Sequence, residues 1–188
     1  RLRVAFESPK MVNKVEEAFW TVARGGFLPF FKIIHDPAHV RFIIRTEDDY
    51  EHIALGRKLH EEVTDGYRYS EWGSRHTFNF PTMIIGQYHE PIEMSAEGVE
   101  ITGYVPKTTM QVGVGNQALR PEVEMAKNSL SVFTKMFGAS YPFEAMKVIS
   151  APEQFSWAQA PSSMVYVGQL FLMSDAEVAS WMGANPSA

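Results

Sequence analysis

Two histidines near the start of the sequence have the spacing of metal ligands. His35 and His39 are four residues apart, with Asp36 between them. On a helix this spacing would place both imidazoles on one face, as zinc ligation requires. Pro37 and the strand-like pattern that follows argue against a regular helix, so we interpret the segment as a turn. The other histidines are isolated and have no ligand spacing.

Serine and glycine motifs offer two weaker possibilities. Ser162 and Ser163 follow Pro161, but no Gly-x-Ser-x-Gly elbow surrounds them, and serine beside proline is typical of a turn. Gly113-Val114-Gly115 lacks the third glycine of a dinucleotide fingerprint and the lysine of a phosphate loop, which favours a plain connection. The sequence contains no cysteine and no H-E-x-x-H motif. These residues therefore predict no catalytic centre and no metal site of their own.

The composition is that of an ordinary globular protein. The chain has 188 residues, of which 45% are hydrophobic and 21% charged, enough for one large domain or two small ones. Its net charge is -5, and lysine and arginine form no basic stripe, which argues against nucleic acid as a partner. No apolar run approaches the roughly 20 residues of a membrane-spanning helix. The compartment stays open, because a secreted protein need not use disulfides.

The first part of the chain is predicted to be rich in strands. Apolar and polar residues alternate over residues 2–6 and 40–45, the signature of a strand with one buried face. Residues 53–59 and 67–72 are predicted as two further strands, and Asp65-Gly66 between them supplies the positive φ angles of a tight hairpin turn.

One segment of this part favours a helix instead. Apolar residues recur at helical spacing at Val12, Val15, Phe19, Val22 and Ala23. This pattern predicts a short amphipathic helix over residues 11–24, ended by Gly25-Gly26.

The second part of the chain is predicted to alternate between strands and helices. Its strands are expected at residues 83–88, 92–96, 99–105, 146–149 and 163–167, with a hairpin turn at Glu97-Gly98. The clearest helix spans residues 119–137, with Pro121 in its first turn, Glu122 and Glu124 near its positive end and Gly138 as its cap. Ser174 followed by Glu177 is a capping box, which predicts a short helix over residues 174–182.

Together these elements predict an α+β fold. A β-rich unit over residues 1–84 is followed, over residues 85–188, by a mixed sheet with one long amphipathic helix. The seam between the two units is expected near residues 80–88.

The run from Tyr141 to Pro152 carries a family resemblance. With the helix before it and the strand after it, this run resembles the stretch just upstream of the zinc site in M1-type (gluzincin) metallopeptidases. Weaker matches in the same order include Leu28-Pro29-Phe30-Phe31 and Ala54-Leu55-Gly56-Arg57, so that the resemblance covers roughly residues 28–173. It implies the end of an N-terminal β domain joined to the start of a thermolysin-like catalytic domain. It also implies zinc, bound by an H-E-x-x-H helix that would lie beyond Ala188 in the full-length protein.

The sequence departs from that family at the substrate-edge strand. Aminopeptidases of the family carry Gly-x-Met-Glu-Asn there, and the Glu binds the free amine of the substrate. Depending on where a one-residue gap falls, Gln159 or Ala160 replaces this Glu, and neither carries a negative charge. Trp157 stands in the same stretch, where it either shapes a side-chain pocket or packs against the neighbouring domain. The resemblance therefore implies Trp157, Gln159 and Ala160 as substrate-binding residues.

Two functional hypotheses follow. In the first, the chain is part of an M1-like zinc metallopeptidase, aminopeptidase-like, whose peptide substrate is cleaved only by the full-length protein. In the second, it belongs to a non-catalytic peptidase-like module that binds proteins or peptides, which the loss of the amine-binding Glu favours. An unrelated α+β domain is the third reading.

Overall fold

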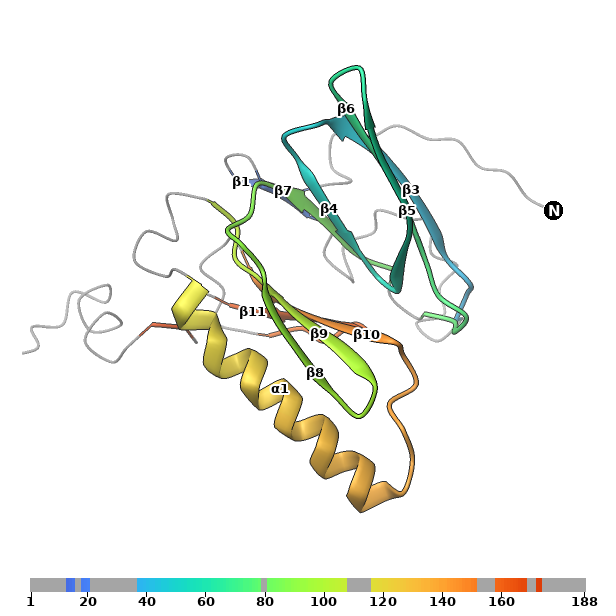
Figure 1. The fold of residues 1–188 in the computed structure, drawn as a ribbon, viewed down its shortest axis with the longest axis vertical. Helices are drawn as coiled ribbons and strands as arrows, with labels where there is room; N and C mark the ends of the chain where they lie inside the picture. Colours follow the sequence, from blue (N-terminus) through green and yellow to red (C-terminus); the bar gives the residue numbers. More distant parts are fainter. Residues whose placement is uncertain are drawn as a thin grey trace, which may run out of the picture.

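The structure, a computed structural model, describes residues 13–15, 18–20, 37–78, 81–107, 116–151, 158–168 and 172–173. The described strands form three sheets, and one long helix covers a face of the third (Figure 1). The elements are β1 (Asn13–Val15), β2 (Ala18–Trp20), β3 (Arg41–Glu47), β4 (Glu51–Ala54), β5 (Arg57–Thr64), β6 (Tyr67–Gly73), β7 (Met83–Gly86), β8 (Ile92–Ala96), β9 (Val99–Tyr104), α1 (Asn116–Phe137), β10 (Ala145–Ser150) and β11 (Met164–Val167). This mixture of sheets with one helix confirms the predicted α+β class.

The sheet β3-β6-β5 forms around the predicted hairpin turn. Asp65 and Gly66 have φ angles of 51° and 76°, and β5 and β6 pair antiparallel on either side of them. The predicted alternation of β3 is confirmed, because Phe42 and Ile44 are buried while Ile43 is 61% exposed. The buried side chains of β3 face the rest of the protein.

Two predictions are wrong in the sheet β1-β2-β7-β4. The helix predicted over residues 11–24 is wrong, because β1 and β2 pair antiparallel and β2 pairs in turn with β7. Valine and aromatic residues favour strands, and a partner strand more than 60 residues further on outweighs the weak helical spacing. The single strand predicted over residues 53–59 is also wrong. Gly56, with a φ of 84°, separates β4 from β5, and the two strands belong to different sheets.

The third sheet has the order β11-β10-β9-β8. β9, β10 and β11 are parallel, whereas β8 pairs antiparallel with β9 through the predicted turn at Glu97 and Gly98. The helix α1 makes the crossover from β9 to β10, as parallel strands require.

The helix α1 begins earlier than predicted. It starts at Asn116, so Pro121 lies inside the helix and no acidic residue lies in the first turn. The expected position of Pro121 in the first turn is therefore wrong, and Glu122 and Glu124 lie beyond the first turn. The C-terminal end agrees with the prediction, since Gly138 has a φ of 62° and its N–H donates to the carbonyl of Thr134 at 3.0 Å. Of the helices that the structure describes, none is long and apolar enough to cross a membrane.

Two apolar cores lie on opposite faces of this third sheet. Val148 of β10 packs under α1 with Leu119 and Val123, whereas the next residue, Ile149, packs with Ile53 and Ile84 of β4 and β7. Successive side chains of a strand point to opposite faces, so β10 contributes to both cores in turn. The β-rich sheets and the third sheet thus share one core. The predicted boundary at residue 84 falls inside β7, which pairs entirely with β2 and β4.

Candidate functional site

The candidate site lies at the outer edge of the third sheet, beside β11. After residue 158 the chain turns at Pro161 to Ser163, where the N–H of Met164 donates to the carbonyl of Pro161 at 3.0 Å. Ser162 has a φ of 52°, which this tight reversal requires. The turn brings Gln159 opposite Tyr166 in an antiparallel bridge. Residues 158–160 therefore lie outside β11; we call them the edge segment.

The N–H and carbonyl groups of the edge segment point alternately toward β11 and away from it. The N–H of Gln159 donates to the carbonyl of Tyr166 at 3.1 Å, and the N–H of Tyr166 donates to the carbonyl of Gln159 at 2.7 Å. Because peptide groups alternate along an extended chain, those of Ala158 and Ala160 point away from β11. Both alanines are exposed. An extended peptide could therefore pair with the edge segment by strand addition.

The structure brings together only two of the three predicted site residues. Gln159 is half-buried and Ala160 is exposed on the edge segment, whereas Trp157 lies outside the described residues. Neither Gln159 nor Ala160 brings a charge to this edge. Tyr141 supports the turn, because its hydroxyl donates to the carbonyl of Ser162 at 3.1 Å and burial raises the pKa of Tyr141 to about 12.

A buried polar cluster, which the sequence did not predict, connects the edge segment to the β-rich sheets. Ser163 accepts a hydrogen bond from the N–H of Gly56 at 3.2 Å, and its carbonyl accepts one from the N–H of Lys147 at 2.9 Å. The ammonium of Lys147 in turn donates to the carbonyl of Gly56. A second link joins Tyr166 to Thr82 through their hydroxyls, 2.9 Å apart. These bonds fix the hairpin of the edge segment to the β-rich sheets.

Lys147 is unusual within this cluster. It is 4% exposed, and its ammonium lies 5.1 Å from the ring centroid of Trp72. Burial lowers the pKa of Lys147 to about 7, while the charge of Glu100 acts in the opposite direction. A lysine inside the apolar run from Met146 to Ile149 was the one available signal. Its partners could not be read from the sequence, because the Gly56 carbonyl is 91 residues away.

A second buried network begins at the indole N–H of Trp72. The indole N–H donates to Oγ of Ser70 at 3.0 Å, and Thr46 Oγ1 donates to the carbonyl of Glu47 at 2.9 Å. His52 joins these two hydroxyls, with Nδ1 at 2.7 Å from Ser70 and Nε2 at 2.6 Å from Thr46. Since the proton of Thr46 is already used, His52 must carry its proton on Nε2 and accept from Ser70 at Nδ1. Burial, first, and Arg68 lower the pKa of His52 to about 4, so the ring is neutral.

The run that carries the family resemblance contacts the β-rich part. Phe143 stacks on Phe78 with ring centroids 5.5 Å apart. Glu144 lies 3.4 Å from Arg57 and 3.7 Å from Arg75, at their Nε atoms. All three charged groups are about half exposed or more, so these ion pairs contribute little to stability. The contacts of Phe143 give the run a packing role.

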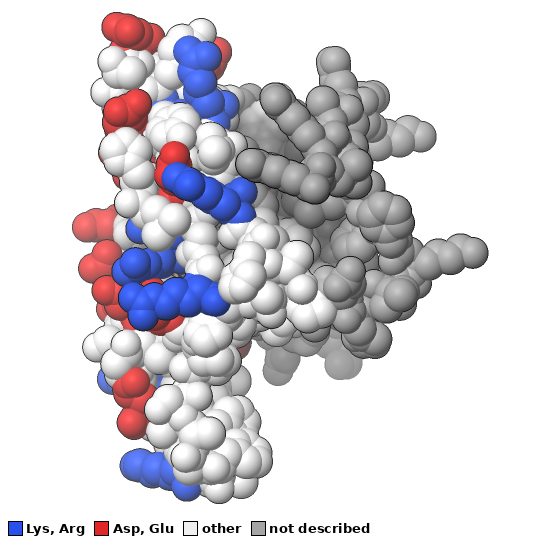
Figure 2. Space-filling model, turned by 90° about the vertical axis from the view of Figure 1, so that its right-hand side faces the viewer, with Lys and Arg blue, Asp and Glu red and all other residues white. Residues whose placement is uncertain are grey.

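Charges of both signs are mixed on the face shown in Figure 2. Lys58 and Arg68 both pair with Glu61, at 2.8 Å and 3.0 Å, and Arg41 pairs with Glu71. Within the part of the chain that the structure describes, no three His, Cys, Asp or Glu side chains lie close enough to hold a metal ion. His39 is exposed, and its predicted companion His35 lies outside the described residues. No family model and no curated protein matches this sequence.

Proposed function

We propose that this chain builds the substrate-side edge of the cleft of an M1-like zinc metallopeptidase, with peptide-bond hydrolysis performed by the full-length protein. The observation that carries the proposal is the bridge between Gln159 and Tyr166. It places the edge segment alongside β11, in the stretch where the resemblance implies the substrate-edge strand. A cleft wall of this kind holds an extended peptide by backbone hydrogen bonds and leaves the side chains to select it.

Each edge residue has a distinct role in the proposal. The outward peptide groups of Ala158 and Ala160 pair with the substrate backbone. Gln159 or Ala160 occupies the place of the amine-binding Glu, so the substrate amine meets an amide or a methyl group instead of a carboxylate. Because charge-assisted hydrogen bonds are about twice as strong as neutral ones, preference for a free N-terminus is weakened. Trp157 is proposed to shape a side-chain pocket.

Zinc does not fit the described residues, because they bring together no donor set. Its ligands would have to come from an H-E-x-x-H helix beyond Ala188, so no catalytic step is assigned to this chain.

The first experiment is the intact mass of the native gene product, with peptide sequencing across and beyond Ala188. A longer chain that carries H-E-x-x-H and a further Glu ligand supports the zinc peptidase. A native end at or near Ala188 would rule out the zinc mechanism.

The neutral edge favours a second candidate, a peptide-binding module without catalysis. Amide NMR shifts of the full chain, titrated with an extended peptide, test the binding surface shared by both candidates. Residues 158 and 160 should shift, whereas β8, the strand at the opposite edge of the same sheet, serves as the control. Equal shifts at both edges would contradict a dedicated site. A downstream H-E-x-x-H then separates enzyme from binder.

A further inference from the structure

A basic pocket lies at one end of the β3-β6-β5 sheet. Its volume is about 320 Å³. The polar and glycine residues that line it are Arg41, Arg57, Arg75, His39, Ser74 and Gly73. Among the described residues of the lining, none is acidic. Three arginines in one pocket without a carboxylate favour an anionic ligand.

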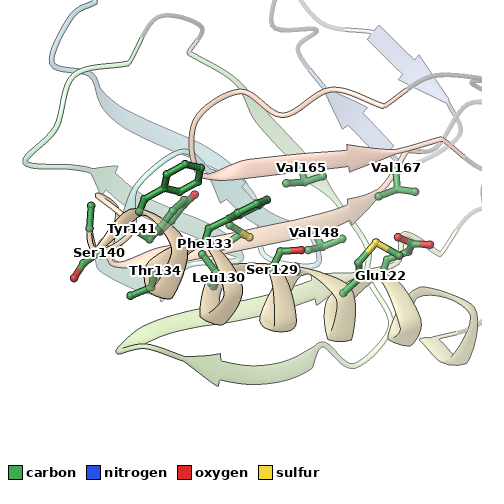
Figure 3. A pocket seen from close by; sticks show the side chains of 15 residues that line it. Glu122, Ser129, Leu130, Phe133, Thr134, Ser140, Tyr141, Val148, Val165 and Val167 are labelled. Carbon is green, nitrogen blue, oxygen red and sulfur yellow. The ribbon is translucent and has the colours of Figure 1, made fainter.

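A larger groove has a different chemistry. It lies between α1 and β11, has a volume of about 550 Å³ and is lined mostly by apolar side chains, with Glu122 at one end (Figure 3). Its described lining contains no lysine and no arginine. Positive side chains therefore gather at the smaller pocket and not at the larger groove.

The register of the β3-β6-β5 sheet places two of the arginines on one face. Arg41 of β3 and Arg57 of β5 both pair with Gly73 of β6, which lies between them. Residues directly opposite each other in an antiparallel pair point to the same side, and strands are about 4.8 Å apart, so the two Cα atoms are roughly 10 Å apart. Gly73 brings no side chain into this gap. Leu59 covers the glycine, because its Cδ1 lies 3.1 Å from the place of a Cβ at residue 73. The pocket thus has an apolar floor between two guanidinium groups.

The arginines of the pocket have too few carboxylate partners. Arg41 donates to Glu71, whereas Arg57 and Arg75 share Glu144, whose oxygens lie 3.4 Å and 3.7 Å from their Nε atoms. Both distances exceed the roughly 2.8 Å of a charge-assisted hydrogen bond. Among the described residues, Glu144 is the one anionic partner of both arginines. One carboxylate for two guanidinium groups leaves positive charge at the pocket.

The donors of the pocket match a phosphoryl group better than a carboxylate. The Oγ of Ser74 accepts the N–H of His76 at 3.0 Å, so its hydroxyl proton can still be donated to a ligand. A phosphoryl group offers three strong acceptor oxygens and up to two negative charges, and guanidinium forks bind it through paired hydrogen bonds. Because Arg41 and Arg57 start on opposite sides of Gly73, two linked phosphoryl groups can contact both of them.

We propose that this pocket binds a small soluble ligand through one or two phosphoryl groups, and that the ligand displaces Glu144 from Arg57 and Arg75. The guanidinium groups and the hydroxyl of Ser74 donate to the phosphoryl oxygens. Glu144 competes with the ligand, because it is itself an anion that both arginines hold. A soluble ligand is favoured over a lipid headgroup, since the net charge of -5 disfavours approach to an anionic membrane. The inference goes beyond the proposed function, because it concerns the β3-β6-β5 sheet and not the edge segment.

Calorimetric titration of the full chain with inorganic pyrophosphate, at low ionic strength, tests the pocket. Arg57→Gln and Arg75→Gln should each weaken binding about tenfold, because each removes charge-assisted hydrogen bonds. Both side chains are more than half exposed, so the fold should tolerate the changes. Arg45→Gln is the matched control, since it removes the same charge from the outer face of β3, where Arg45 lies over the Tyr67 ring and does not line the pocket. Its affinity should stay near the wild-type value. Absence of binding in the wild type, or an equal loss in Arg45→Gln, would overturn the proposal.

The competition by Glu144 predicts a gain of affinity. Glu144→Gln should tighten pyrophosphate binding about threefold, because it releases two arginines from an exposed ion pair. Glu62→Gln removes the same charge at an exposed site that pairs with His60 and does not line the pocket, and it should leave the affinity unchanged. Equal affinities in the two variants would contradict displacement.

Vesicles of phosphatidylcholine with phosphatidic acid present the same phosphoryl chemistry on a lipid. The chain should not sediment with them. Sedimentation that Arg57→Gln abolishes would overturn the assignment to a soluble ligand.

Discussion

Where the β-rich sheets meet the third sheet, some residues cannot be replaced by larger ones. Gly56 is the tightest case, since its carbonyl accepts from Lys147 and its N–H donates to Ser163. A Cβ at this position would lie 2.2 Å from the carbonyl oxygen of Gly73, and the φ of 84° already disfavours other residues. The backbone here leaves no room for a side chain.

The first prediction is that Gly56→Ala destabilises the protein far more than Gly66→Ala. Gly66 also has a positive φ, of 76°, but nothing lies within 4 Å of its added Cβ. We expect a loss of about 1 kcal/mol at Gly66, from backbone strain alone, and of at least about 3 kcal/mol at Gly56, where a backbone clash is added. Urea unfolding curves measure both, and similar losses would show that the seam can shift.

The second prediction concerns the tautomer of His52. Because the hydroxyl proton of Thr46 goes to the carbonyl of Glu47, the proton of His52 must lie on Nε2, and burial keeps the ring neutral down to a pKa of about 4. The ¹⁵N shifts of the imidazole, followed from pH 7 to pH 4, should show an Nε2–H ring that charges only at the acid end. Thr46→Val should remove the fixed tautomer. A proton on Nδ1, or titration near pH 6.5, would contradict the network.

The helix α1 packs tightly against the sheet at Gly103 of β9. A Cβ there would lie 2.6 Å from Cγ2 of Val123. This contact sets the distance between helix and sheet.

The third prediction follows from that contact. Gly103→Ala should cost about 1–3 kcal/mol by overpacking. In the Val123→Ala background the same change should cost much less, because the clashing methyl group is gone. A double-mutant cycle on the unfolding free energy measures this coupling, and strictly additive losses would show that the helix moves away freely.

Elements that depend on local signals were predictable, and those that depend on distant partners were not. The turns at Asp65-Gly66 and Glu97-Gly98 carry their conformation in two residues, so both hairpins were predicted correctly. The strands β1 and β2 were mistaken for a helix because their partner β7 is remote in the sequence. The break at Gly56 was missed because the alternation of apolar residues continues across it.

The candidate site, too, was predictable only in part. The edge segment with Gln159 and Ala160 came from the family resemblance, and the structure places it beside β11. Lys147 and Gly56 are 91 residues apart, and the sequence around each of them gives no sign of the hydrogen bond between them.

At the scale of the whole molecule, the buried Lys147 couples stability to pH. In the folded protein its pKa is about 7, against an ordinary 10.5. Between these values the unfolded chain binds more protons than the folded one, so stability rises with pH. Below about pH 7 both states are charged and the full cost of burial is present.

The fourth prediction is a rise in stability of up to about 1.4 kcal/mol per pH unit between pH 7 and pH 9.5, which Lys147→Met abolishes. Lys58→Met is the control, because Lys58 lies 5.4 Å from the same Trp72 ring but its side chain is 39% exposed. Urea unfolding at each pH measures the slope. A slope that persists in Lys147→Met would assign the effect to other groups.

The seam also sets the order in which a newly made chain can finish folding. The bond between Gly56 and Ser163 joins residues 107 positions apart, and the core over Ile53 and Ile84 is completed only by Ile149, Met164 and Tyr166. Hairpins close within microseconds, but this apolar face has to wait for the last strands to leave the ribosome. At synthesis rates of roughly 5–20 residues per second, that wait lasts several seconds or more. During it the apolar face of the β-rich sheets is exposed, and exposed apolar surface of this kind favours aggregation of a nascent chain.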